Sequence, residues 1–434
     1  MKIINIVPGF GGTFYCGNCL RDSAFTNSLK NTGHDAITLP LYLPLSSSNN
    51  YTEDGLPIFY GAVNVYLEQK FKFFRHMPKW LHKFLNSPAI LRYASKKSES
   101  TRASGLEEMT ISMLKGSEGY QEEELELLIN FLKNHEKPDV VHLSNALLMG
   151  LAGRIREELN IPVICSLQDE DVWLDAMSDD YQTRLWEIMC ERSKDIDAFI
   201  TVSQYFGDVM QRRMCIPDEK LHIVPIGVDP KAYRFSEPVQ NPPVIGYLSR
   251  MNEENGFEVI IDAFIELKKK DNFKNALLKA TGGKTADDDK FIKKQLKKLK
   301  QNGFENDIEF IDDFRTEKLS DFFEKLTVLS VPVLKGEAFG MYQLEALASG
   351  IPIVQPALGA FPEIVKNTKG GMIYEPNTPD ALASKLAEIL SNKEKLNEMG
   401  KNGREAVENK YNTNELTRQM LSIYEKVISA SQKK

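Results

Sequence analysis

The first residues, KIINIVPGFGGTFYCGNCLRDSAFTNSLKNTGHDAITLPLYLP (residues 2–44), decide the fold class. The apolar run at 2–7 predicts a buried strand, and the Gly-rich stretch behind it predicts a loop. Asn18 then caps a predicted helix, Gly33 ends it, and a second apolar run follows. A strand, a loop, a helix and another strand in this order typically open a doubly wound parallel sheet.

The same alternation continues along the chain. In the first half, apolar runs predict further strands at 138–144, 161–168, 197–203 and 221–227, because parallel strands buried on both faces are almost continuously apolar. In the second half, such runs lie at 242–249, 276–283, 308–312, 326–333 and 351–357. The sequence therefore predicts an α/β protein built from two similar halves.

The domain boundaries follow from this pattern. Four prolines between Gly227 and Val244 indicate a linker. We expect a first domain over 1–228, joined by a C-terminal helix at about 415–434, and a second domain over 240–412. Residues 64–135 break the alternation and look mostly helical, which predicts an insertion that carries function or a partner contact.

The composition excludes several classes of protein. The chain has 434 residues, of which 54 are basic and 61 acidic, so its formal net charge is −7. Nucleic-acid binders are usually basic, so we expect no nucleic acid among the partners. Five cysteines form no disulfide scaffold in a chain of this length, and their odd number fits a reducing compartment. Without a secretory signal or a long apolar run, the sequence predicts a soluble, cytoplasmic protein.

The sharpest functional motif is KGEAFGMYQLEALASGIPIV at 335–354. Glycines flank Glu337, so backbone N–H groups can approach a ligand there. A helix predicted to begin near Gly340 would direct its N-terminal N–H groups at a phosphate or sugar oxygen. Glu345, in the second turn, could accept hydrogen bonds from a ribose diol. The spacing alone also fits an ordinary capped helix with solvated acids.

The stretch EAFGMYQLEALASGIPIVQPALGAFPEIV (337–365) resembles the signature of the family-4 retaining glycosyltransferases, also called glycosyl transferases group 1. Further segments resemble this family in the same order, at 221–230, 245–257, 278–283, 308–314 and 370–386. The resemblance implies the GT-B fold, in which two Rossmann-like domains face each other across a cleft. It covers most of residues 197–411 and is weaker in the first half.

The resemblance also implies roles for individual residues. Glu337 would contact the transferred sugar, Arg250 would neutralise the diphosphate leaving group, and Glu345 would bind the ribose. Further donor contacts would come from Gly11, Gly12, Gly282, Gly283, Phe314, Ala338, Phe339, Gly340 and Met341. Enzymes of this fold usually need no metal and no cofactor beyond the nucleotide sugar. We accordingly interpret Asp287–Asp289 as a helix start rather than a metal site.

Two positions depart from the family pattern. Where the family normally has a lysine five residues after the arginine, this chain has Asn255, which carries no charge. Lys284 is a candidate substitute for that lysine. Where many relatives have a histidine, this chain has Gln168, which can bond a hydroxyl but cannot act as a base.

The acceptor side is predicted from strand ends in the first half. Gln168, Asp169 and Glu170 follow a buried strand, and ligands of such sheets bind outside the carboxyl ends of strands. The two acids also fit a helix cap and first turn. His142 ends another strand, where either an acceptor contact or simple packing fits. Cys16 and Cys19 form a C-x-x-C pair, for which we favour packing over redox or zinc chemistry.

Residues 69–97 contain eight basic residues, no acidic residue and six interleaved aromatic ones. Basic aromatic helices often lie on anionic membranes, and they also suit anionic acceptors. The alternative is that the aromatics form the insertion's own core and the lysines are solvated. We expect the segment to border the acceptor entrance. We also expect it to hold the protein peripherally at the inner face of the cell membrane.

Together these features predict a retaining, metal-independent hexosyltransferase of polysaccharide biosynthesis. It would move a sugar from a UDP- or GDP-sugar to a glycan or lipid-linked acceptor. The alternative is a degenerate GT-B protein that binds a nucleotide sugar or glycan without turnover. An epimerase or a phosphorylase on the same fold is a second alternative.

Overall fold

The computed structural model describes residues 1–9, 15, 17–42, 59–60 and 105–433. The chain divides into two compact units. The first comprises Met1–Gly12, Asn18–Val224 and Thr417–Lys434, and the second comprises Thr13–Gly17 and Pro225–Leu416. A short stretch around Tyr15 is thus grouped with the second unit, although the chain on both sides of it belongs to the first.

The first unit is built on a parallel sheet of six strands in the order β2-β1-β3-β4-β5-β6. Ile3 of β1 pairs with Ala36 of β2 on one side and with Val140 of β3 on the other. All three side chains are almost completely buried, as expected for strands covered on both faces. The strands are β1 (Lys2–Val7), β2 (Asp35–Pro40), β3 (Val140–Leu143), β4 (Val163–Ser166), β5 (Ala198–Thr201) and β6 (Leu221–Ile223).

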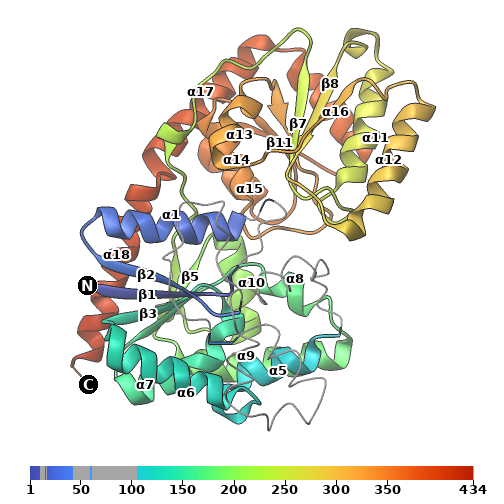
Figure 1. Cartoon of the computed structure of the whole chain (residues 1–434). Helices are drawn as coiled ribbons and strands as arrows, with labels where there is room; N and C mark the ends of the chain where they lie inside the picture. Colours follow the sequence, from blue (N-terminus) through green and yellow to red (C-terminus); the bar gives the residue numbers. More distant parts are fainter. Residues whose placement is uncertain (10–14, 16, 43–58, 61–104, 434) are drawn as a thin grey trace. The chain divides into compact units, whose positions relative to one another are not determined.

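Helices cover both faces of this sheet, with α1 along one face and α6 and α7 along the other (Figure 1). They are α1 (Gly17–Asn31), α5 (Glu107–Lys115), α6 (Glu122–Phe131), α7 (Ala152–Leu159), α8 (Glu170–Leu174), α9 (Asp179–Arg192), α10 (Gln204–Met214) and α18 (Thr413–Ser431). The described part of the predicted insertion is helical and contains α5 and α6. From Thr417 onward α18 belongs to this unit, where Thr417 bonds Ser28 and Tyr424 is fully buried.

The second unit contains another parallel sheet of six strands, in the order β12-β11-β10-β7-β8-β9. Its strands are β7 (Val244–Leu248), β8 (Leu277–Thr281), β9 (Ile308–Ile311), β10 (Val328–Leu329), β11 (Ile353–Pro356) and β12 (Gly371–Tyr374). The apolar run at 326–333 forms only the two residues of β10, and Pro332 has no N–H to donate to a ladder. β12, which pairs with β11, is the strand that the predicted set lacked.

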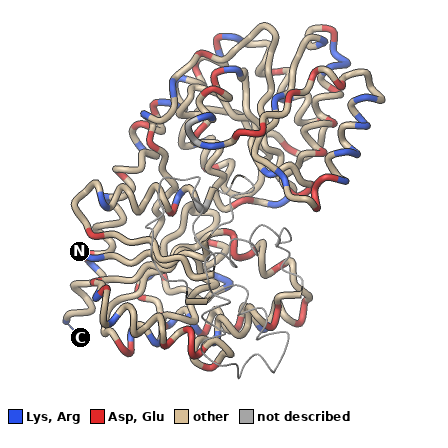
Figure 2. The backbone as a smooth tube through the Cα atoms, viewed as in Figure 1, with Lys and Arg blue, Asp and Glu red and all other residues tan. Residues whose placement is uncertain are grey.

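The helices of the second unit are α11 (Phe257–Lys268), α12 (Asp289–Gln301), α13 (Thr316–Phe323), α14 (Met341–Ala348), α15 (Phe361–Thr368), α16 (Pro379–Leu390) and α17 (Lys393–Lys410). α14 differs from the others in that all eight of its residues are buried. Acidic and basic residues are interspersed over the outer helices (Figure 2). Among the helices of the described residues, none has both the length and the apolarity to cross a membrane.

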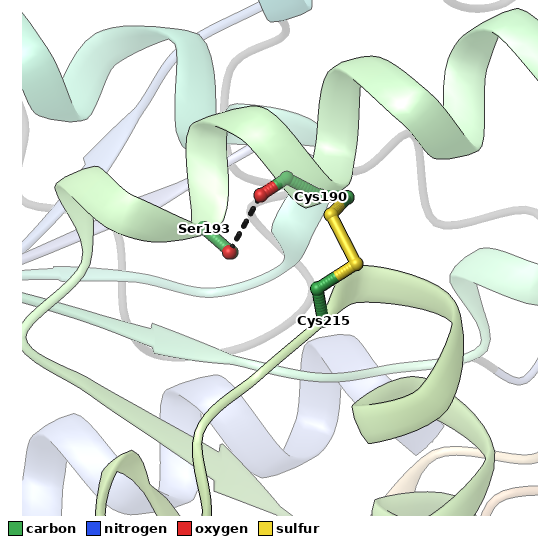
Figure 3. The surroundings of a disulfide bond; sticks show 3 residues. All are labelled: Cys190, Ser193 and Cys215. Atoms are coloured by element: carbon green, nitrogen blue, oxygen red, sulfur yellow. Dashed lines mark hydrogen bonds between the residues drawn. A yellow bond between two sulfur atoms is a disulfide. The ribbon is translucent and has the colours of Figure 1, made fainter.

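Cys190 and Cys215 form a disulfide in the first unit (Figure 3). Cys190 lies near the end of α9 and Cys215 directly follows α10, with 5.2 Å between their Cα atoms. Ser193 donates a hydrogen bond of 2.8 Å to the Cys190 carbonyl beside it. The cysteine count gave no indication of this pair, because the two cysteines are 25 positions apart in the sequence and are brought together only by the packing of α9 against α10.

Candidate active site

The strand order of the second sheet reverses between β7 and β10. From β7 the chain proceeds to β8 on one side, and it later reaches β10 on the other side of β7. In open α/β sheets, ligands bind outside the carboxyl ends of the strands at such a reversal. Arg250 lies two residues after β7, and Glu337 lies in the connection from β10 to α14. The topology therefore places both predicted residues at the position where a ligand is expected.

Tyr247, the fourth residue of β7, interacts with groups of the loop that contains Arg250 and is affected by the charge of Glu337. Its hydroxyl donates to the carbonyl oxygens of Arg250, at 3.0 Å, and of Asn255, at 3.1 Å. Burial raises the pKa of Tyr247 well above its usual value, and the negative charges of Glu337 and Asp288 raise it further. The carboxylates of Glu337 and of Asp288, the ionic partner of Arg250, thus both contribute to the raised pKa of this buried hydroxyl.

Glu337 is partly exposed and is held by the start of α14. Its carboxylate accepts a hydrogen bond of 3.0 Å from the Tyr342 hydroxyl, and its carbonyl accepts one of 3.1 Å from the Ala360 N–H. Gly340 precedes α14 with φ of 84°, and a Cβ there would lie 2.8 Å from Glu337 Oε2. Only glycine therefore lets the helix begin this close to the carboxylate.

Glu345 is completely buried, so the alternative of an ordinary capped helix with solvated acids does not describe it. Tyr15 donates a hydrogen bond of 2.6 Å to Oε2, and Tyr233 donates one of 2.7 Å to Oε1. Burial raises the pKa of Glu345, and these two hydrogen bonds oppose that rise. A ribose diol that binds Glu345 must compete with the two tyrosine hydroxyls. The sequence analysis did not identify either tyrosine, because each lies far from Glu345 along the chain.

Arg250 forms a two-point ion pair with Asp288. Its Nε and Nη2 donate to the two carboxylate oxygens at 2.8 and 3.0 Å, and Nη2 also donates to the Thr285 hydroxyl at 2.8 Å. Burial acts to raise the pKa of Asp288, but hydrogen bonds from Arg250 and Thr285 outweigh burial and hold it below its usual value. The amide of Asn255 donates to the Arg250 carbonyl at 3.1 Å.

The other predicted donor residues occupy the same edge of the second sheet. Gly282 and Gly283 follow β8 with φ of 117° and 77°, and a Cβ on Gly282 would lie 2.4 Å from the Ser249 carbonyl. Lys284 pairs with Asp289 at 2.6 Å. Half-buried Phe314 follows β9, while Ala338, Phe339 and Met341 are buried at the start of α14.

In the first unit, Gln168 follows β4 and is bonded to the loop after β3. Its side-chain amide donates to the Ser144 carbonyl and, at 3.4 Å, to Asp22 Oδ1. Arg21 Nη2 donates to the same Asp22 oxygen at 2.9 Å. Burial raises the pKa of Asp22 to about 6, against the opposing effect of Arg21. Arg21 and Asp22 were missed by the sequence analysis, since only the fold brings α1 beside these strand ends.

The two acids after Gln168 have different environments. Glu170 is 1% exposed, and its two carboxylate oxygens accept the N–H groups of Ala146 and Gln168, each at 2.7 Å. Burial raises the pKa of Glu170 to about 7 against these hydrogen bonds. Glu170 therefore fastens one loop to the other rather than facing a ligand. Asp169 is partly exposed, has a left-handed φ of 56° and does not cap α8 through its side chain.

His142 is buried, and both of its ring nitrogens are engaged. Nδ1 contacts the Tyr424 hydroxyl, and Nε2 lies 2.8 Å from the Ser166 hydroxyl. Burial and the charge of Arg21 lower the pKa of His142 to about 3, so the ring is neutral. This geometry favours the packing interpretation over an acceptor contact.

Several predicted features lie outside the described residues. They are Gly11, Gly12, Cys16, the Cys19 side chain and the basic segment 69–97. The predictions about these residues stay predictions. In the part of the chain that the structure describes, no group of three or more His, Cys, Asp or Glu side chains is arranged to hold a metal ion.

Comparison with solved structures shows the fold. Sucrose-phosphate synthase from Thermosynechococcus elongatus matches with a TM-score of 0.72 at 16% identity, over 99% of this chain and 100% of that one. Anabaena HepE in complex with UDP matches with a TM-score of 0.68 at 14% identity, over 98% and 100% of the two chains. These likenesses, together with the two six-stranded parallel sheets, identify the GT-B fold.

Curated relatives are similar at lower coverage. MMP alpha-(1->4)-mannosyltransferase of Mycolicibacterium hassiacum is 25% identical over 240 residues, which are 55% of this chain and 56% of that protein. Alpha-maltose-1-phosphate synthase of Mycolicibacterium smegmatis is 24% identical over 326 residues, which are 69% and 82% of the two chains. The first match thus spans little more than half of the mannosyltransferase.

Two family models match adjoining parts of the chain. The model of Glycosyl transferases group 1 matches residues 229–406, which contain Arg250, Glu337 and Glu345. The model of Glycosyltransferase Family 4 matches residues 120–232, which contain Gln168 and Asp169. The two models together match residues 120–406, about two thirds of the sequence, and over this stretch the chain is similar to the glycosyltransferases of group 1 and family 4.

Proposed function

We propose that this protein is a retaining hexosyltransferase that uses a UDP- or GDP-sugar. The observation that carries the proposal is the reversal of strand order between β7 and β10, where Arg250 follows one strand and Glu337 follows the other at the carboxyl edge of the second sheet. A carboxylate for sugar hydroxyls and a guanidinium for phosphates thus lie at one strand-end edge. The similarity to a mannosyltransferase and to a maltose-1-phosphate synthase supports transfer of hexoses.

The donor would be bound by residues of the second unit. Glu337 would accept hydrogen bonds from hydroxyls of the transferred sugar. Arg250 and the N–H groups at the start of α14 would stabilise the charge that develops on the departing diphosphate. This positive field would serve without a metal ion. Glu345 would bind the ribose after the hydroxyl of Tyr15 or Tyr233 moves away from its carboxylate.

The acceptor would be bound by residues of the first unit. Gln168 and Asp169 follow β4 at the edge where ligands of open sheets bind, and Asp169 is the partly exposed acid there. The acceptor hydroxyl would attack from the side of the leaving group, and a phosphate oxygen would take its proton. The configuration of the sugar would thereby be retained.

Release of nucleoside diphosphate tests the donor half of this proposal. The purified full chain is incubated with UDP-glucose, UDP-N-acetylglucosamine or GDP-mannose, and released UDP or GDP is measured. We expect slow hydrolysis of one donor, and a decrease of at least about tenfold in Glu337→Gln with an unchanged thermal midpoint. Glu398→Gln, an exposed acid on α17, is the matched control. Normal release by Glu337→Gln would remove Glu337 from the mechanism.

A non-catalytic sugar-binding protein is the second candidate. It is favoured by Asn255, whose neutral amide stands where the family normally has a lysine and bonds the Arg250 carbonyl. In that case the wild-type protein would bind a nucleotide sugar in calorimetry without releasing UDP or GDP.

The acceptor class is proposed from sequence. The basic and aromatic segment 69–97 fits a lipid-linked or anionic glycan acceptor and contact with an anionic membrane. Co-sedimentation with vesicles that contain anionic lipid, at low and high salt, tests the membrane contact. Absence of binding at low salt would refute it.

A further inference from the structure

The cation expected to meet the donor diphosphate already has an anionic partner within the protein. Asp288 holds both Nε and Nη2 of Arg250, and their side chains are 7% and 22% exposed. Two parallel charge-assisted hydrogen bonds are among the stronger polar contacts in proteins. A diphosphate at this position must therefore share the guanidinium with a fixed carboxylate.

Asp288 is also held independently of Arg250. Its Oδ2 accepts hydrogen bonds from the Thr285 N–H at 2.7 Å and from the Thr285 hydroxyl at 2.9 Å. The first of these contacts belongs to a capping box, in which the Asp288 N–H in turn donates to the Thr285 side chain, at the short helical turn Ala286–Asp288 that leads into α12. A carboxylate anchored at a helix N-terminus stays in place when its other partner changes.

The second cation nearby is compensated in the same way. Lys284 pairs at 2.6 Å with Asp289, the residue that follows Asp288 in the sequence. At the third position, Asn255 is neutral and donates to the backbone. The consecutive acids that the sequence analysis assigned to a helix start thus compensate both cations expected near the phosphates.

We propose that Asp288 is a counter-anion of Arg250 that lowers the affinity of the diphosphate subsite. The proposal rests on the proposed function, because it assigns Arg250 to the donor phosphates. The negative charge of Asp288 repels a diphosphate across the guanidinium, and the low exposure of the pair weakens solvent screening of this repulsion. Donor affinity then depends more on the nucleoside and the sugar than on the phosphates, and the spent nucleoside diphosphate leaves readily.

Asp288→Asn provides the test, because asparagine keeps an oxygen for the Thr285 contacts and removes the charge. Binding of UDP, uridine and inorganic pyrophosphate to the full chain is measured by calorimetry at 50 mM and 500 mM salt. We expect Asp288→Asn to bind UDP and pyrophosphate about fivefold tighter at low salt, with a smaller gain at high salt. Uridine, which has no phosphate, should bind equally to both proteins.

Asp287→Asn is the matched control, since it removes the same charge from the exposed residue that precedes Asp288 in the sequence. It should change UDP affinity less than twofold. If Asp288→Asn lowers the thermal midpoint, Asp288→Ser, which retains a hydroxyl for the cap, takes its place.

Two results would overturn the proposal. Weaker binding of UDP and pyrophosphate in Asp288→Asn would mean that Asp288 orients Arg250 for the phosphates. Unchanged binding would mean that the carboxylate has no effect on the subsite. Failure of the proposed function is a separate outcome: the wild-type protein would bind neither UDP nor GDP, while pyrophosphate would still report the effect of Asp288 on Arg250.

Discussion

Replacing Tyr233 by phenylalanine should destabilise the second unit, and the loss should grow with pH. The Tyr233 hydroxyl donates to Glu345 Oε1 at 2.7 Å, in a place where the carboxylate is completely buried. Phenylalanine preserves the ring that packs against Phe323 but leaves this oxygen without that donor. Water has little access to replace the donor, so the charge remains poorly solvated.

The magnitude follows from the kind of hydrogen bond that is lost. A hydrogen bond to a charged group contributes about 1.5–3 kcal/mol, so we expect a loss of about 2 kcal/mol. The second unit has about 190 residues, for which each kcal/mol shifts the midpoint by about 2–4 °C. Tyr233→Phe should therefore lower the midpoint of the transition that unfolds this unit by about 4–8 °C at pH 8.

The pKa of Glu345 determines whether the stability difference between wild type and Tyr233→Phe grows or falls with pH. Burial raises the pKa of Glu345 in the folded protein, and the Tyr15 and Tyr233 hydroxyls oppose that rise. Without Tyr233 the folded pKa rises further above the unfolded value. A folded pKa above the unfolded one costs stability as pH rises through that interval. The difference between wild type and Tyr233→Phe should thus be larger at pH 8 than at pH 5, as measured by scanning calorimetry.

Tyr374→Phe is the control, because its hydroxyl donates at 2.8 Å to the neutral side-chain oxygen of Asn377 in the same unit. This loss should cost about 1 kcal/mol and depend little on pH. Equal shifts for Tyr233→Phe and Tyr374→Phe, or a Tyr233→Phe shift that is the same at pH 5 and pH 8, would refute the inference that the Tyr233 hydroxyl stabilises the ionised form of Glu345.

Three further predictions concern other contacts. Asp22→Asn should stabilise the first unit by about 2 kcal/mol at pH 7.5 and hardly at pH 4. The reason is that the folded pKa of about 6 lies above the unfolded value, so ionisation of Asp22 lowers the free energy of unfolding at the higher pH. Urea unfolding at both pH values measures this difference. Replacing Cys190 and Cys215 by alanine should cost about 3.5 kcal/mol for a 25-residue separation in oxidising buffer, and no difference should remain under a reductant, in thermal scans. Tyr15→Phe should tighten uridine binding several-fold in calorimetry, since the Tyr15 hydroxyl otherwise occupies Glu345 Oε2; weaker uridine binding would contradict this.

Most of the fold was predictable because its elements are local in sequence. The six strands of the first sheet and five of the second coincide with the apolar runs identified in the sequence. β12 was missed because Gly371–Tyr374 has only three apolar residues in a row, between two glycines and Glu375, and such glycines indicate a turn.

The candidate site was predictable only in part. Glu337, Gly340 and Glu345 are recognisable because one loop and one helix hold them all within a short stretch of sequence. Arg250 was identified only through the family resemblance, and its partner Asp288 was assigned only to a helix start. That contact joins residues 38 apart through the packing of two loops, and no local pattern encodes it.

By itself, the sequence determined the alternation of strands and helices and the two halves, and it singled out the motif at 335–354. These features depend on periodicity, glycine conformations and spacing, which are properties of neighbouring residues. Only the tertiary structure decided the protonation and availability of the site groups. It buries Glu345 beneath Tyr15 and Tyr233, and it pairs Arg250 with Asp288. The pKa of a group depends on desolvation and on the charges nearest in space, which residues far apart in the chain supply.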